Sequence, residues 1–280
     1  MAELFAIMMS LPLKYGFVNE RWCQATDVML EKKQGVRKIH QLRIIGLMKA
    51  DFNTALKLLF VKKMMYNAER SGISCEQWGG RPNRTALDTA VRKMLTLDYA
   101  RSTYKTVAIF ANDAMACFDR MVPRISSLIA RKFGISQTVM RCRNERIKRL
   151  RRNIRTGCGD SEEYYDEHDG DDPMNGEVQG KVDVASLWCL MSHTILTAHS
   201  ALHTPIEMTG ATKGCKVEKN NDAFVDDTDG YAEANNRDGE AEKEAVHSLQ
   251  QKAQSRARLI AVLGGAIAFH NCIWQVIGWN

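Results

Sequence analysis

The sequence lacks any pair of cysteines at C-x-x-C spacing, although it contains eight cysteines among 280 residues. Zinc sites and thiol redox motifs need such spacing, and disulfide frameworks belong to much shorter chains. We therefore exclude both classes of protein. Scattered cysteines fit a reducing intracellular compartment, which is the nucleus or the cytoplasm.

The sequence also lacks a long apolar run. The longest, residues 259–269, is well short of the roughly 18–20 residues that a membrane span needs. Residues 1–13 are fairly apolar, but they include Glu3 and no basic start, which makes a poor secretory signal. We expect a soluble, non-secreted protein that does not bind membranes.

The charge is modest in sum but unevenly placed. The net charge is +6, and 45% of residues are hydrophobic, which is ordinary for a globular protein. Residues 141–155 carry eight basic side chains against one glutamate, and residues 160–172 carry eight acidic ones. Basic clusters favour phosphate backbones, whereas a solvated helix face beside an acidic loop is the alternative interpretation.

Residues 223–231 read Ala-Phe-Val-Asp-Asp-Thr-Asp-Gly-Tyr. Apolar residues on both sides of an Asp- and Gly-rich turn predict a tight β-hairpin with Asp226 and Asp227 at its tip. Adjacent carboxylates repel each other and attract cations, and oxygen ligands suit Mg²⁺. A calcium loop with Gly230 at its sixth position is excluded, because its first and twelfth positions would be Val225 and Asn236.

Local patterns predict the remaining elements and an α+β fold, because short strands and helices mix without strict alternation. Thr85 is a candidate helix cap, and Trp188, Trp274 and Trp279 are expected in the core. The predicted elements are hairpin strands at 28–30 and 42–47, helices at 51–69, 85–102, 120–133 and 138–150, a strand at 106–112, a loop or irregular hairpin at 157–176, a helix from 179, a helix at 240–263 and a last strand at 266–279.

The order of these pieces resembles the fingers and palm of a reverse transcriptase of retroelement type. Residues 112–120 (Asn-Asp-Ala-Met-Ala-Cys-Phe-Asp-Arg) are similar to the first catalytic motif, and Gln179-Gly180 to the second. Residues 224–227 look like the aromatic-x-Asp-Asp box. The lysines 32 and 33 and residues 42–45 resemble fingers motifs, and residues 264–274 resemble the end of the palm.

The resemblance implies nucleotidyl transfer with two Mg²⁺ ions, or Mn²⁺, roughly 3.5–4 Å apart. The catalytic and metal-binding residues would be Asp113, Asp226 and Asp227, with Asp113 and Asp226 ranked first. The expected partners are dNTPs and an RNA or DNA template with its primer.

Further roles follow from the same resemblance. The incoming triphosphate would be held by Lys32, Lys33 and Arg43, the last through its bidentate fork. Phe118 would exclude a 2′-hydroxyl and so favour deoxynucleotides. The nascent base pair would contact Gln179 and Gly180. Candidate contacts for template and primer phosphates are Arg81, Arg84, Arg149 and Arg152.

The implied domains are fingers at 1–104, the first palm strand and helix at 105–135, a fingers or loop insertion at 136–178, and palm at 179–280. No thumb, RNase H or endonuclease segment is recognised, so a longer polyprotein is expected to supply them. Three places depart from the family pattern: Val178 replaces a usual glycine, Val184-Ala185 stand where small residues or proline are usual, and Asn271 stands where a lysine is common.

These departures indicate a truncated or partly decayed copy of the polymerase. They also keep a second hypothesis open, in which a catalytically inactive palm that kept its fold binds nucleic acid without turnover. A third hypothesis, an RNA-directed RNA polymerase, is disfavoured by Phe118, because such enzymes place an Asp at this spacing and here Asp119 comes one residue later.

Overall fold

The computed structural model describes residues 2–35, 38, 42–165, 180–210, 212, 214–234 and 240–278. The chain divides into two compact units, each made of two separate chain segments. Unit 1 consists of Met1–Ser71 and Phe118–Leu187, and unit 2 of Gly72–Cys117 and Trp188–Asn280.

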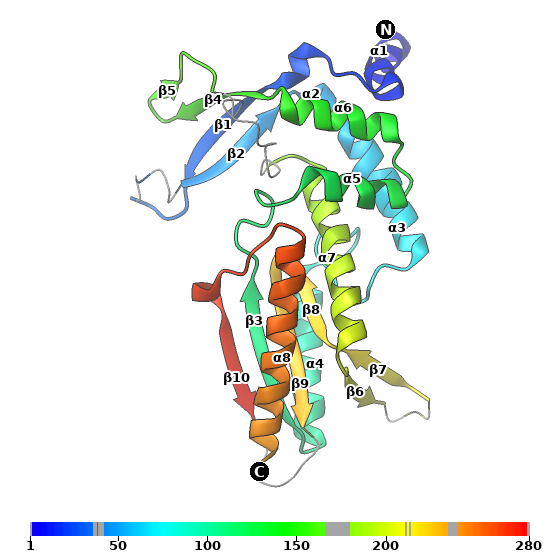
Figure 1. Ribbon diagram of the computed structural model, residues 1–280, viewed down its shortest axis with the longest axis vertical. Coiled ribbons are helices and arrows are strands. Elements are labelled where there is room, and N and C mark those ends of the chain that lie inside the picture. Colours follow the sequence, from blue (N-terminus) through cyan, green and yellow to red (C-terminus); the bar gives the residue numbers. More distant parts are fainter. Residues whose placement is uncertain are drawn as a thin grey trace. The chain divides into compact units, whose positions relative to one another are not determined.

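Unit 1 contains a sheet and several helices (Figure 1). Its strands are β1 (Gln24–Glu31), β2 (Leu42–Met48), β4 (Arg151–Thr156) and β5 (Gly159–Asp160), in the order β2-β1-β4-β5. β1 pairs antiparallel with β2 and parallel with β4. The helices are α1 (Ala2–Tyr15), the 3-10 helix η1 (Glu20–Cys23), α2 (Ala50–Leu56), the π-helix η3 (Lys57–Met64), α3 (Met65–Ser71), α5 (Pro123–Lys132) and α6 (Gln137–Lys148).

The elements α2, η3 and α3 follow one another without a break, as the helical periodicity of residues 51–69 predicts. Their apolar stripe, which includes Phe52, Phe60 and Met64, is fully buried. The Phe52 ring packs on Trp22 with ring centroids 4.8 Å apart. This stripe builds the core of unit 1.

Unit 2 contains an antiparallel four-stranded sheet in the order β10-β3-β9-β8. The strands are β3 (Thr106–Asp113), β8 (Asn221–Phe224), β9 (Asp227–Ala234) and β10 (Ile273–Ile277), with a separate hairpin of β6 (Ile206–Thr209) and β7 (Lys216–Lys219). The helices are α4 (Ala86–Ser102), α8 (Ala241–Val262) and the 3-10 helix η4 (Phe269–Asn271). Helix α7 (Val184–Leu202) begins in unit 1 and continues in unit 2.

Helices α4 and α8 cover opposite faces of the unit 2 sheet. Ala108 of β3 packs with Ala245 of α8, whereas its neighbour Val107 packs with Ala100 of α4. Figure 1 shows α8 lying along β3 and β9. Because side chains alternate along a strand, even-numbered residues of β3 face α8 and odd-numbered ones face α4.

Several predicted elements are confirmed, and some bounds are corrected. The 28–30 and 42–47 hairpin, the strand at 106–112 and the hairpin at Asp226-Asp227 are present. Thr85 caps α4 in a capping box with Asp88. The last strand is shorter than predicted, because residues 269–271 form η4. The helix predicted from residue 120 begins at Pro123, and α7 begins at Val184 rather than at residue 179.

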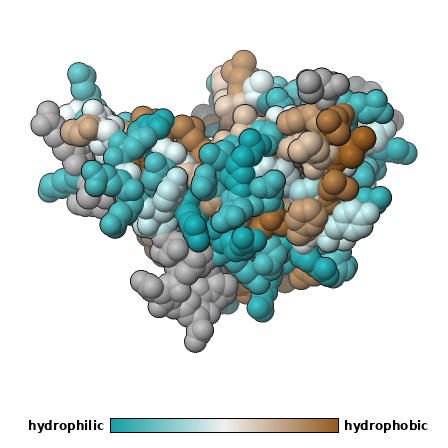
Figure 2. All heavy atoms as spheres, turned by 90° about the horizontal axis from the view of Figure 1, so that it is seen from above, coloured by the Kyte–Doolittle hydropathy of each residue, from teal (hydrophilic) through white to brown (hydrophobic). Residues whose placement is uncertain are grey.

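Some side chains also differ from expectation. Trp188 is buried as predicted, but Trp274 is 65% exposed, and Trp279 lies outside the described residues. The eight cysteines, which all lie in the described part of the chain, form no disulfide with one another. In the described part of the chain, no helix is both long and apolar enough to cross a membrane. Figure 2 shows apolar side chains gathered at the right of the view, the side on which α1 lies in Figure 1.

Candidate active site

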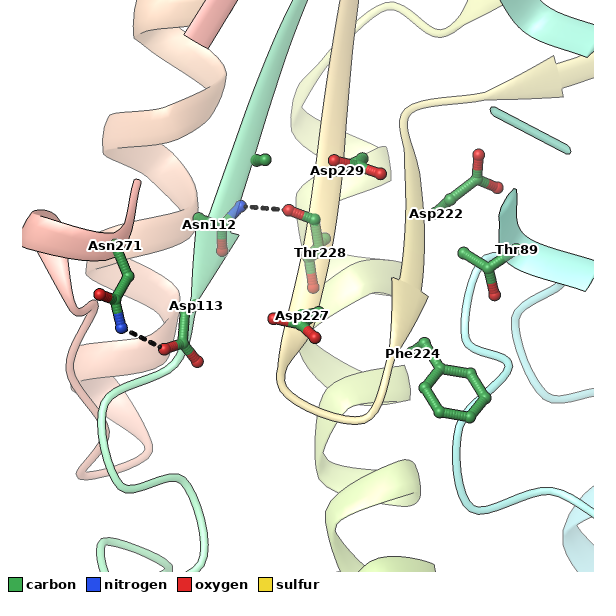
Figure 3. Close-up of a pocket in the computed structure, with 10 residues that line it drawn as sticks. Thr89, Asn112, Asp113, Asp222, Phe224, Asp227, Thr228, Asp229 and Asn271 are labelled. Carbon is green, nitrogen blue, oxygen red and sulfur yellow. Dashed lines mark hydrogen bonds between the residues drawn. The ribbon is translucent and has the colours of Figure 1, made fainter. Parts of the chain in front are cut away.

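Two aspartates stand opposite each other at one end of the unit 2 sheet. Asp113 ends β3 and Asp227 begins β9, and the two residues are partners in the antiparallel register. Side chains of such partners lie on the same face, with Cβ atoms roughly 4.5–5.5 Å apart. Figure 3 shows both carboxylates at this end of the two strands. Residues 114 apart in the sequence are thus joined into one acidic pair.

The third predicted acid, Asp226, lies in the two-residue turn between β8 and β9. Its neighbour Val225 has φ of 59°, which is unfavourable for a β-branched residue. Two neighbours hold the turn: the Trp188 indole Nε1 donates to the Val225 carbonyl at 2.6 Å, and Gly79 lies against the Val225 backbone. The surrounding structure therefore fixes the hairpin tip in a conformation that its own sequence disfavours.

Burial and neighbouring charges disfavour the ionised forms of Asp226 and Asp227. Burial raises the pKa of Asp226, and the nearby Asp113 carboxylate adds to the rise, while a hydrogen bond from the Cys117 thiol opposes it. Partial burial also raises the pKa of Asp227, with repulsion from Asp226, Asp113 and Asp229 in the same direction. A bound cation would remove this repulsion.

A cavity of about 210 Å³ opens beside the acid pair (Figure 3). It is lined by Thr89, Ala111, Asn112, Asp113, Asp222, Phe224, Asp227, Thr228, Asp229 and Asn271. The Asn271 amide Nδ2 donates to Asp113 Oδ2 at 2.8 Å. The backbone amide of Ala268 donates to the Asp113 carbonyl at 2.9 Å, so that the end of β3 is held by main chain and side chain.

Two further aspartates of the cavity are neutralised by α4. Asp229 pairs with Lys93 at 2.9 Å, and Asp222 pairs with Arg92 at 2.9 Å. The sequence interpretation missed both aspartates as cavity residues. Asp229 had a local signal, because alternation places it on the same face as Asp227. Asp222 is the hairpin partner of Asp229, so it also had a local signal, whereas its ion pair with Arg92 spans 130 residues.

The donor set fits Mg²⁺. Among the described residues, no three acidic, histidine or cysteine side chains gather closely enough to hold a metal ion by themselves. Mg²⁺ in phosphoryl-transfer sites commonly takes one or two carboxylates and completes its shell with water and substrate phosphate. Asp113 with Asp226 or Asp227 supplies that number of carboxylates.

Unit 1 carries most of the residues predicted to bind nucleotide. Lys32 and Lys33 follow β1 directly, and Arg43 lies on β2; all three are exposed. Phe118 is half-buried. Gly180 has φ of 102°, and a Cβ there would lie 3.0 Å from the Gly46 carbonyl oxygen of β2. Gly180 is expected to allow a close approach of the backbone to the nascent base pair. In the structure, the close neighbour of Gly180 is strand β2 of the same unit.

The predicted phosphate-binding arginines differ in whether they already bind other groups of the protein. Arg81 donates to the Ser74 and Gln77 carbonyls, and Arg152 pairs with the buried Asp27. Arg149 is exposed at the end of α6. Exposed Arg84 stacks on Trp78 at 4.5 Å. Gln179 and Val178 lie outside the described residues.

The predicted basic helix at 138–150 does not present one solvated basic face. Arg143 is buried and binds Asp183 at 2.8 Å, and Arg146 is buried and binds the Trp22 carbonyl at 2.8 Å. The basic run then continues into β4. These two arginines are therefore part of the buried structure of unit 1, because a buried guanidinium needs such hydrogen-bonding partners.

No protein-family model and no curated protein sequence matches this chain. Solved structures of telomerase do match. Apo telomerase from Candida tropicalis, truncated from its C-terminal domain, aligns over 97% of this chain and 55% of its own, with a TM-score of 0.59 and 10% identity. Telomerase from Candida albicans, in complex with the TWJ fragment of telomeric RNA, aligns over 98% and 45%, with a TM-score of 0.57 and 9% identity.

At such identities the likeness shows the fold alone, and this chain spans about half the length of those telomerase chains. The α+β architecture and the small antiparallel sheet agree with that likeness. The acid pair lies on the sheet of unit 2. The chain therefore shares the fold of these telomerase structures, an α+β architecture whose small antiparallel sheet fits a polymerase palm.

Proposed function

We propose that the chain is an RNA-directed DNA polymerase domain of retroelement type, whose reaction centre is the acid pair of unit 2. The observation that carries the proposal is the register of Asp113 with Asp227, beside the hairpin tip that bears Asp226. The cavity next to this pair provides open space, and the raised pKa values of Asp226 and Asp227 favour a cation there.

Asp113 and Asp226 would be the main Mg²⁺ ligands, and Asp227 the third. Bound Mg²⁺ supplies the charge that activates the primer 3′-hydroxyl and shields the leaving pyrophosphate. The chain's own contribution is rigid placement of the carboxylates, through the β3–β9 ladder and the braced turn at Val225. Mn²⁺ is expected to substitute, since it also prefers oxygen ligands.

In unit 1 we propose that Lys32, Lys33 and Arg43 bind the triphosphate of a dNTP. Their exposure on the β1–β2 hairpin supports this role. Phe118 would discriminate against ribonucleotides, and Gln179 with Gly180 would contact the nascent base pair. The telomerase from Candida albicans is described in complex with an RNA fragment, which makes an RNA template a reasonable partner to test here.

For template and primer phosphates, Arg84 and Arg149 are the stronger candidates because both are exposed. Arg81 and Arg152 already bind partners within the protein, so their contacts with nucleic acid would have to compete with those bonds.

The proposal is tested by primer extension on an RNA template with dNTPs and Mg²⁺. The wild-type chain should incorporate dNTPs, and Asp113→Asn and Asp226→Asn should each reduce the rate by about 10²-fold or more. Asp98→Asn, which removes an exposed acid of α4, is the matched control and should keep full activity. No incorporation by the wild type would refute the proposal.

A second function is favoured by one observation. Asn271 stands where the resemblance expects a lysine, and its amide is bonded to Asp113. A palm that binds nucleic acid without turnover would tolerate this arrangement. Such a protein should bind RNA in a salt-dependent manner, and its affinity should survive Asp226→Ala, in the absence of any metal-dependent extension.

A further inference from the structure

Beneath the acid pair, on the opposite face of the sheet, lies a buried arginine. Arg256 of α8 is 4% exposed. Its Nε donates to Asn112 Oδ1 at 3.0 Å, and its Nη2 donates to Thr228 Oγ1 at 2.6 Å. Asn112 and Thr228 are the residues directly beside Asp113 and Asp227 in the sequence. One guanidinium thus spans the ends of both strands that carry the acids.

Strands β3 and β9 are also hydrogen-bonded to each other at the residues that Arg256 contacts. Asn112 and Thr228 are partners in the register, and the Asn112 Nδ2 donates to the Thr228 carbonyl at 2.9 Å. The Asn112 side chain therefore accepts from Arg256 and donates to β9. Both residues are almost fully buried, so these bonds form where water does not compete.

The arrangement is costly for stability alone. Burial lowers the pKa of Arg256 to about 10. Within the described part of the chain, its Nη1 has no hydrogen-bond partner, and the nearby charge of Glu76 offsets only part of the effect of burial on its pKa. Burying a cation whose hydrogen-bond acceptors, Asn112 and Thr228, are both neutral costs hydration free energy. Residues such as Ala108 and Leu249 form an apolar cluster on this same face.

We propose that Arg256 is a positioning residue, which fixes the ends of β3 and β9 so that Asp113 faces Asp227. The planar fork of arginine suits this task, because two nitrogens of one rigid group reach acceptors on two strands. Its importance for catalysis rests on the proposed function, whereas the placement itself can be measured without activity or metal.

Lys252 is a matched control one helical turn away. It is also 4% exposed, and its Nζ binds the Thr204 carbonyl at 2.7 Å, Asn220 Oδ1 at 2.8 Å and the Tyr231 carbonyl at 2.8 Å. Loss of Lys252 should therefore destabilise unit 2 without touching Asn112 or Thr228. A defect shared by both variants would reflect stability rather than positioning.

The experiment measures the register by cross-linking. Asp113→Cys and Asp227→Cys are combined with Cys117→Ser and Cys272→Ser, and disulfide formation is followed under mild oxidation at a temperature where circular dichroism shows every variant folded. Opposed cysteines cross-link readily only when the strands are held in register. The rate should fall about tenfold with Arg256→Met, fall less with Arg256→Lys, and stay unchanged with Lys252→Met.

If Arg256→Met does not fold, Thr228→Val removes one acceptor in a similar volume and should slow cross-linking in the same direction. An unchanged rate in Arg256→Met, or in Thr228→Val where that variant replaces it, would overturn the inference. So would an equal decrease in Lys252→Met.

Primer extension separates this inference from the proposed function. With native Asp113 and Asp227, Arg256→Met should lower kcat and leave the KM for dNTPs unchanged, because the triphosphate is assigned to other residues. An inactive parent protein would refute the proposed function, and the cross-linking comparison would still decide the role of Arg256.

Discussion

The Asn271 amide donates a hydrogen bond of 2.8 Å to Asp113 Oδ2, across 158 residues of sequence. The bond joins the 3-10 helix before β10 to the last residue of β3. It orients a carboxylate that the proposed reaction needs, and it leaves Oδ1 without that constraint. Asn271, which stands where the resemblance expects a lysine, is therefore bonded directly to one residue of the acid pair.

Asn271→Ala should weaken divalent-cation binding by about tenfold or more, because a ligand that loses its orienting hydrogen bond binds metal less well. The measurement is Mn²⁺ binding followed by electron paramagnetic resonance. Gln275→Ala, an exposed change on the adjacent β10, should leave the affinity unchanged. Equal affinities in Asn271→Ala and wild type would show that the bond does not orient the site.

Asp226→Asn should raise stability at neutral pH. The folded pKa of Asp226 lies above its unfolded value, so ionisation costs folding free energy once the pH rises through the folded pKa. Below the unfolded value, both states are protonated and the cost disappears. The midpoint of thermal unfolding should therefore exceed that of wild type at pH 7, and the difference should shrink as the pH falls towards 4.

The control for this experiment is Asp98→Asn, which removes an exposed acid and should change the midpoint little at either pH. A lower midpoint for Asp226→Asn at pH 7 would mean that the ionised carboxylate is stabilised in the fold, contrary to its burial and its acidic neighbours.

Gly79→Ala should destabilise unit 2 by about 1–3 kcal/mol, because the added Cβ has no room. It would lie 2.1 Å from the Val225 backbone nitrogen, so the hairpin tip would have to move. Gly157→Ala is the matched control, since a Cβ there meets nothing within 4 Å. Chemical denaturation of both variants provides the comparison. Equal stability of the two would exclude close packing of the hairpin tip against Gly79.

Val225→Asn should stabilise the protein by about 1 kcal/mol, because asparagine tolerates positive φ better than a β-branched residue. Val217→Asn, an exposed change on β7, should be neutral or slightly destabilising. Thermal unfolding of both variants is the measurement. A stability loss in Val225→Asn would show that the valine side chain contributes more through packing than its backbone costs.

Phe118→Ala should admit ribonucleotides in primer extension, with discrimination between dNTP and NTP falling about tenfold or more, because the flat ring no longer excludes a 2′-hydroxyl. Phe269→Ala, which removes a 74% exposed ring, serves as the control. Unchanged discrimination in Phe118→Ala would remove Phe118 from the site.

The sequence predicts the elements whose signals are local. The hairpin at Asp226 and Asp227 is found because its turn chemistry and its flanking apolar residues lie within nine positions. The Thr85 cap is found for the same reason. The exposed Trp274 and the buried Arg143 are missed, because burial depends on partners far away in the sequence, such as Asp183.

The candidate site divides in the same way. The sequence identifies the acids as candidates, and its apolar pattern predicts the strand that ends at Asp113. The register that places Asp113 opposite Asp227 depends on strand pairing between distant segments, which the sequence alone does not show. Arg256 has no local signal at all. It is one cation within a long amphipathic helix, and its role follows only from its contacts with Asn112 and Thr228.

The interleaving of the two units bears on how the chain is made. Unit 1 is completed only at Leu187, and β3 gains β9 and β10 only after the ribosome has added more than a hundred further residues. During that interval the apolar strand that ends at Asp113 has no pairing partner from its own sheet. A nascent chain of this design therefore exposes an aggregation-prone strand during translation, and its yield in a heterologous host should depend on chaperone supply and on growth temperature.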